Sequence, residues 1–137
     1  MNVFDVKIKL DLVYIDKPYI PLNGSLTQYR EFYHFLEGIV NYDIWKSKID
    51  IYSKHKKLIS EYCVWEDKNK ITQAFNDLFD KFKESIIVVS YRDDEIPSIN
   101  QIENMLKDLN KKITIYRESY QYALSKRTTK EVVIVVR

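Results

Sequence analysis

The sequence predicts an α/β fold in which parallel strands and a terminal antiparallel hairpin form one sheet, with helices packed on it. Two observations lead to this prediction. Continuous apolar runs, typical of buried strands, alternate with stretches whose apolar residues recur at helical spacing, and strands joined through helices pair in parallel. The last two apolar runs follow each other without a helical stretch, so these strands are expected to pair antiparallel.

Two strands are predicted near the N-terminus. Residues 3–8 form a short alternating run, and Leu12–Ile15 is a continuous apolar run of the kind that is buried on both faces. The polar tetrapeptide Asp16-Lys17-Pro18-Tyr19 follows at once. Because α/β proteins bind ligands in loops after the carboxyl ends of such strands, this tetrapeptide is the first candidate site.

The strand Leu12–Ile15 is predicted to lie at an edge of the sheet. An apolar edge strand offers unpaired backbone groups to other chains. We therefore expect something to cover it: a missing part of the sheet, a partner chain, or a second copy of this chain.

Helices are predicted at three places. The apolar residues of Tyr29–Val40 fall on one face, and Ile71–Phe82 carries a clear apolar stripe. A third helix starts at Ser98, which has capping-box spacing to Gln101. Between the first two helices, Ile44–Tyr62 is polar and weakly periodic, so it is expected to be partly helical.

Three further strands complete the predicted sheet. Ile86–Val89 is a second buried run, and it ends in the polar cluster Ser90–Asp94. The terminal pair comprises Ile113–Glu118 and Val132–Val136, joined by the polar and basic stretch Gln121–Lys130. The second candidate site is the polar cluster, because it follows a strand expected to lie beside Leu12–Ile15.

Composition excludes several classes of protein. A length of 137 residues predicts a single domain over residues 1–137, and 45% hydrophobic with 31% charged residues is a globular balance. The net charge of +2 is too small to indicate a nucleic-acid partner by itself. Cys63 is the single cysteine, which excludes disulfides and Cys-based zinc sites; with two histidines, we expect no metal. The N-terminus shows no leader pattern, so a cytoplasmic location is expected.

Glycine is scarce. The chain holds two glycines, Gly24 and Gly38, and they lie far apart. A phosphate-binding or dinucleotide-binding loop needs several glycines close together. The usual glycine loop for a nucleotide-like cofactor is therefore not expected in this chain.

Four segments resemble D12-class adenine-N6 DNA methyltransferases. Asp16-Lys17-Pro18-Tyr19 resembles their Asp-Pro-Pro-Tyr signature, which also follows a strand. Residues 29–38 (YREFYHFLEG) are similar to the tract after that signature in one branch of the class. Residues 90–98 (SYRDDEIPS) resemble its later Ser-Tyr-Arg segment, and Tyr122-Ala123-Leu124-Ser125 with Glu131 resembles its C-terminal hairpin.

The resemblance runs from about Asp11 to the end of the chain. It implies the C-terminal half of a Rossmann-like methyltransferase sheet, whose last strand is reversed. In this class the preceding half holds the Gly-rich S-adenosylmethionine loop and the target-recognition insert, and neither is found here. The implied activity is methyl transfer from S-adenosylmethionine to adenine in DNA, with little or none expected from this chain alone.

The resemblance assigns catalytic roles to the tetrapeptide. Asp16 would accept one N–H of the exocyclic amine of adenine, and the backbone carbonyl of Lys17 would accept the other, which localises the nitrogen lone pair. The target base must leave the duplex stack, and Tyr19 would stack on it. Pro18 would stiffen the loop.

The resemblance also assigns a target-base pocket and DNA contacts. Ser90, Tyr91 and Arg92 would line the pocket, while Lys126, Arg127 and Lys130 would contact phosphates. Each assignment has a plainer alternative, namely a turn with a satisfied arginine and a solvated basic hairpin. The tetrapeptide alone could likewise be an ordinary turn.

Two residues depart from the family pattern. Lys17 stands in place of the first proline, which frees the loop backbone and places a cation next to Asp16 in sequence. Glu95 stands where the family segment usually has glycine, and it would be strained if that position requires a positive φ. A non-catalytic interaction module, a split subunit that pairs with a donor-binding chain, and an unrelated small α/β protein remain alternatives.

Overall fold

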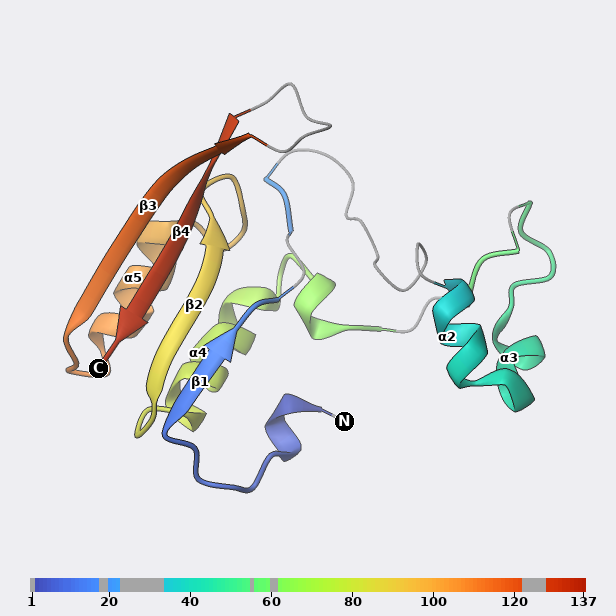
Figure 1. Ribbon diagram of the computed structural model, residues 1–137, viewed down its shortest axis with the longest axis horizontal. Coiled ribbons are helices and arrows are strands. Elements are labelled where there is room, and N and C mark those ends of the chain that lie inside the picture. The colour runs from blue at the N-terminus through green and yellow to red at the C-terminus, as the bar shows by residue number, and fades with distance from the viewer. Residues whose placement is uncertain (1, 18–19, 23–33, 55, 60–61, 122–127) are drawn as a thin grey trace.

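The described residues of the computed structural model are 2–17, 20–22, 34–54, 56–59, 62–121 and 128–137, and they confirm an α/β fold (Figure 1). Their sheet has four strands in the order β1-β2-β4-β3. Strand β1 (Leu12–Ile15) pairs in parallel with β2 (Ile86–Arg92). Strand β4 (Thr128–Val136) pairs antiparallel with both β2 and β3 (Ile113–Gln121). The predicted parallel pair and terminal hairpin are therefore confirmed, with β1 at an edge.

Two helices cover one face of the sheet. They are α4 (Ile71–Lys81) and α5 (Ile99–Lys107), and both lie behind the strands in Figure 1. The capping box predicted for the second is present, since the Ser98 side chain accepts from the Gln101 backbone N–H while the Gln101 side chain accepts from the Ser98 backbone N–H. The core between these helices and the sheet includes Ile71, Phe75, Leu78, Phe79, Ile87, Val89, Tyr91, Ile102, Leu106, Val132, Ile134 and Val136.

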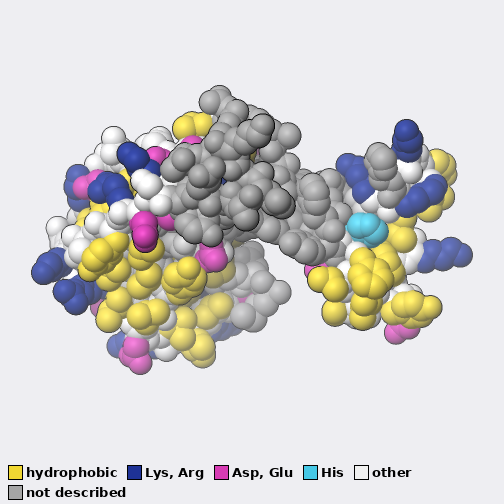
Figure 2. Space-filling model, turned by 45° about the horizontal axis from the view of Figure 1, so that its top comes forward, with side chains coloured by type: hydrophobic (Ala, Val, Ile, Leu, Met, Phe, Trp, Pro, Cys, Tyr) yellow, Lys and Arg dark blue, Asp and Glu magenta, His cyan; other side chains and the backbone are white. Residues whose placement is uncertain are grey.

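The opposite face of the sheet is open, so burial on both faces of β1 and β2 was a wrong prediction for the described chain. Along β2 the buried positions alternate with less buried ones, and Ile86 is 40% exposed. Tyr14 of β1 and Tyr116 of β3 are 59% and 60% exposed. Figure 2 shows hydrophobic side chains at the surface of this part of the molecule. The apolar runs of β1 and β2 are therefore buried on one face of the sheet only.

The N-terminal strand predicted over residues 3–8 is also wrong. Val3–Asp5 form a short 3₁₀ helix, η1, because Asn2 caps it: the Asn2 side chain accepts from the Phe4 backbone N–H at 3.1 Å. The Phe4 ring stacks on Trp65 of η2 (Val64–Glu66), with centroids 6.1 Å apart. A 3₁₀ turn lets Val3 and Phe4 both pack against the core, which an alternating strand would prevent.

Helices α2 (His34–Val40) and α3 (Tyr42–Lys48) lie apart from the sheet (Figure 1). They match the C-terminal part of the predicted helix 29–40, whose residues 29–33 lie outside the described residues, and the helical part of residues 44–62. Gly38 packs directly under the Trp45 ring. The apolar side chains of α2 are exposed: Phe35 62%, Leu36 55%, Ile39 58% and Val40 83%. Within the described residues, no helix is long and apolar enough to cross a membrane.

Candidate functional site

The first candidate site lies at the carboxyl end of β1, beside the last residues of β2. Ile15 is the register partner of Val89, so Asp16 and Ser90 follow at the same edge of the sheet. Asp16 is exposed there. The two polar segments singled out in the sequence are thus neighbours in space, although about seventy residues separate them in the chain.

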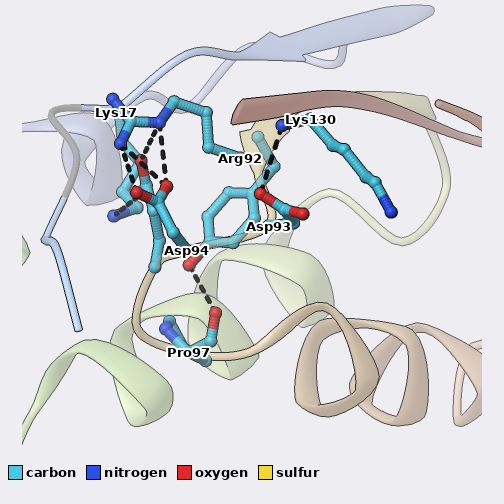
Figure 3. A network of polar contacts seen from close by, with 8 residues as sticks. Lys17, Arg92, Asp93, Asp94, Pro97 and Lys130 are labelled. Carbon is cyan, nitrogen blue, oxygen red and sulfur yellow. Dashed lines mark hydrogen bonds and ion pairs between the residues drawn. The ribbon is translucent and has the colours of Figure 1, made fainter. Parts of the chain in front are cut away.

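Lys17 points into the protein, unlike its neighbour Asp16. It is 7% exposed, and its ammonium lies 5.4 Å from the centroid of the Tyr91 ring and 5.7 Å from that of Phe75. The same ammonium is 3.7 Å from Oε2 of Glu95. Lys17 therefore reaches from the tetrapeptide to the segment that follows β2 (Figure 3).

Glu95 is fully buried, at 0% exposure. Its carboxylate faces two cations, because Nε of Arg92 lies 3.4 Å from Oε1 and Lys17 faces Oε2. Neither oxygen has a partner at hydrogen-bonding geometry among the residues that the structure describes. The condition for strain at this position is not met, since the described non-glycine residues with positive φ are Lys56 and Asn110.

Burial shifts the pKa of both partners. It lowers the pKa of Lys17, and the attraction of Glu95 opposes that shift. It raises the pKa of Glu95 to about 8, against the attraction of Lys17 and Arg92. Burial, aided by the Glu95 charge, also raises the pKa of Tyr91. The ion pair is therefore held in surroundings that penalise either charge alone.

The backbone that follows the tetrapeptide is hydrogen-bonded to residues 94–96, in the segment after β2. The Leu22 N–H donates to the Asp94 carbonyl, and the Ile96 N–H donates to the Ile20 carbonyl, both at 3.0 Å. Pro21 and Glu95 form the bridge between these bonds. Ile20 is 0% exposed and belongs to the core. We call these contacts between residues 20–22 and 94–96 the backbone clamp, and sequence reasoning missed them.

Tyr91 and Arg92 are engaged within the protein. The Tyr91 side chain is 0% exposed, and its hydroxyl donates to the Pro97 carbonyl at 2.6 Å. Arg92 binds both carboxylate oxygens of Asp94, at 2.7 and 2.8 Å from Nη2 (Figure 3). Arg92 thus resembles the satisfied arginine of the plainer alternative. Ser90 is half-buried, and the pocket role of these three residues stays a prediction.

The predicted DNA contacts are only partly described. Lys126 and Arg127, like Pro18 and Tyr19, lie outside the described residues. Lys130 is exposed, and its backbone holds the turn after β2: the Asp93 N–H donates to the Lys130 carbonyl, and the Lys130 N–H donates to Oδ1 of Asp93, both at 3.2 Å. Figure 3 shows the Lys130 side chain extending away from the polar cluster, as a phosphate contact would require.

A cavity of about 270 Å³ adjoins the tetrapeptide. Asp16 and Lys17 contribute to its lining, and the rest is apolar or aromatic: Val3, Val13, Tyr14, Ile15, Trp65 and Leu78. Among the described residues that line it there is no glycine, and the exposed carboxylate of Asp16 is the acidic group. These residues alone do not form a cradle for S-adenosylmethionine. The described residues also contain no cluster of three or more His, Cys, Asp or Glu side chains that could hold a metal.

Comparison with known proteins identifies the class to which this site belongs. No family model and no solved structure matches the chain. The chain is 35% identical over 126 residues to the type II methyltransferase M.FokI of Planomicrobium okeanokoites, an alignment that covers 88% of the chain. It is 33% identical over 76% of its length to the modification methylase StsI of Streptococcus sanguinis, and 28% identical over 74% to the modification methylase LlaI of Lactococcus lactis subsp. lactis.

The chain is therefore related in sequence to DNA modification methylases, which confirms the predicted resemblance to DNA methyltransferases; the adenine-N6 class stays a prediction. It spans 15% to 18% of the length of these relatives.

Proposed function

We propose that this chain carries the target-base loop of an adenine-N6 DNA methyltransferase. The observation that supports this best is the position of Asp16, exposed at the carboxyl end of β1 and beside the end of β2. A carboxylate fixed at this edge can accept an N–H of an extruded adenine. The carbonyl of Lys17 is the second acceptor, and Tyr19 is the stacking residue.

Methyl transfer requires S-adenosylmethionine, which supplies an electrophilic methyl group when bound. The chain's own residues hold and orient the amine that receives it. The cavity lacks a cofactor cradle, so we propose that a donor-binding half, in the same protein or in a partner chain, completes the site. The β1 edge is the place for it, because β1 pairs with β2 alone among the described strands. The greater length of the relatives supports this proposal.

DNA is the proposed macromolecular partner and the cytoplasm the proposed location. Lys130 is the described candidate for a phosphate contact, and Lys126 and Arg127 belong to the same hairpin. Binding through phosphates weakens as the salt concentration rises.

The test measures adenine preference directly. Fluorescence anisotropy compares binding of single-stranded oligodeoxyadenylate and oligodeoxythymidylate of equal length at low and raised salt. We expect salt-dependent binding with a preference for adenine, and we expect Asp16→Ala to abolish the preference while Asp43→Ala, an exposed control of equal charge in α3, retains it. Equal affinity for both strands, or a preference that survives Asp16→Ala, contradicts the proposal.

A second candidate function is a non-catalytic interaction module. It is favoured by the uncovered β1 edge and by the exposed apolar face of α2. Light scattering of the purified chain separates the two candidates: a dimer without adenine preference supports the module, and a monomer with adenine preference supports the methyltransferase loop.

A further inference from the structure

We propose that Lys17 and Glu95 are a matched pair of positioning residues that fixes the Asp16 loop to the segment after β2. This inference deepens the proposed function, on which its catalytic meaning rests. The structure brings the two charged groups within 3.7 Å of each other. Two residues that lie far apart in sequence, one in each candidate segment, thus form a single contact.

The pair anchors one side of the loop, and the backbone clamp anchors the other. Lys17 holds Glu95 through its side chain, and Pro21 meets Glu95 through the backbone bridge. The segment from Lys17 to Pro21, which includes residues 18 and 19, is therefore attached at both ends to the same residue. Asp16 immediately precedes the first anchor, so its position depends on that anchor.

Charge complementarity explains why Lys17 and Glu95 are matched. Burial of a lysine at position 17 needs a counter-charge, and the carboxylate at position 95 supplies it. The carboxylate is itself held by Lys17 at one oxygen and by Arg92 at the other. Removing Lys17 leaves the Oε2 side of the buried carboxylate without its cation, whereas removing both partners of a buried pair is often nearly neutral.

Other charged groups also act on Glu95. Arg92 lies 3.4 Å away and attracts the carboxylate, while Asp94 and Glu131 repel it. Tyr91 packs beside both partners and carries no charge at neutral pH. Burial raises the pKa of Glu95 to about 8 and lowers the pKa of Lys17 to about 8, so the two opposite charges coexist mainly near that pH. Near pH 5 Glu95 is protonated. The coupling between the two residues should therefore be large near pH 8 and small near pH 5.

The experiment is a double-mutant cycle in the full chain, with Lys17→Met, Glu95→Gln and the double variant, at both pH values. Three quantities are measured: urea unfolding, amide exchange of Leu22 and Ile96, and preference for oligodeoxyadenylate. At pH 8 each single variant should accelerate the two amides by about tenfold or more and reduce the adenine preference, and the double variant should recover most of both. The matched control is the α5 pair of exposed Lys107 and half-buried Glu103, with Lys107→Met and Glu103→Gln, which should leave both quantities unchanged.

Each outcome decides the matter. Additive effects of the two substitutions on amide exchange at pH 8 overturn the inference. A change in the free energy of global unfolding that leaves amide exchange and adenine preference as in the wild type also overturns the inference. The pair would then stabilise the fold without positioning the loop. If wild type shows no adenine preference, the proposed function fails, and coupled amide exchange still supports the positioning pair. If a single variant does not fold, the double variant must fold with wild-type amide exchange, and its failure overturns the inference.

Discussion

Tyr91→Phe tests whether this tyrosine serves the core or the target-base pocket. The substitution removes one hydroxyl from a residue that is 0% exposed and leaves its ring in edge contact with Phe75, at 6.0 Å between centroids. The hydroxyl donates to the Pro97 carbonyl at 2.6 Å, a short and fully buried bond. We expect Tyr91→Phe to lower stability and to leave adenine preference intact.

The size of the expected loss of stability follows from the Pro97 carbonyl, which remains after its donor is removed. Loss of the donor leaves a buried carbonyl without this bond, which costs about 1.5 kcal/mol. With a urea dependence of about 2 kcal/mol per molar, the unfolding midpoint should fall by roughly 0.7 M. Tryptophan fluorescence in urea measures the midpoint. Tyr116→Phe, at a residue 60% exposed on β3, is the matched control and should not shift it.

Two results would refute this reasoning. An unchanged midpoint would mean that the Tyr91 hydroxyl is not bonded as the structure has it. An unchanged midpoint together with a lost adenine preference would instead place the hydroxyl in the base pocket, as the family resemblance implies.

Three further predictions concern packing and charge. Gly38→Ala should loosen α2 from α3, because a Cβ would overlap the Trp45 ring; a red shift of tryptophan emission measures this, and an unshifted spectrum contradicts it. Phe75→Ala should destabilise the chain by about 3–5 kcal/mol, as measured by urea unfolding, because it empties the centre of the core. Lys17→Met should cost more stability near pH 8 than near pH 5. Folding raises the pKa of Glu95, so the folded state binds more protons than the unfolded state and becomes less stable as the pH rises toward about 8. Removing the Lys17 charge raises the pKa of Glu95 further, so this decrease in stability becomes larger. A pH-independent cost contradicts it.

The elements with strong local signals could be predicted from the sequence. The stripe that begins at Ile71 gave α4, the capping box at Ser98 gave the start of α5, and the uninterrupted link to β4 gave the antiparallel hairpin. Each of these signals lies within a few residues, so tertiary context did not need to be known. Residues 3–8 failed because their alternation resembles a strand, while the cap from Asn2 and the stacking of Phe4 on Trp65 decide the conformation.

The candidate site was predictable as a location and not as a set of contacts. The order of strands predicted that Asp16 and the Ser90 segment would share an edge. Side chains alternate between the two faces along an extended chain, and the alternation continues past Ile15, with Asp16 exposed and Lys17 buried. The inward lysine was not predicted because its burial depends on Glu95, a counter-charge far away in sequence. The signal that could have found the pair was the opposite charge of Lys17 and Glu95, one in each candidate segment.

The open face of the sheet bears on how the proposed partner would dock. Side chains on β1 and β3, with Tyr14 and Tyr116 among them, are exposed on that face, and α2 exposes Phe35 and Val40 elsewhere. Isolated apolar side chains are ordinary on a protein surface, but a sheet face and a helix face that are both uncovered mark surfaces for contact with other protein. A donor-binding half that added a strand at β1 and a layer on this face would bury both the edge and the tyrosines. The Asp16 loop would then lie between the two halves, which is where an acceptor base must meet a methyl donor.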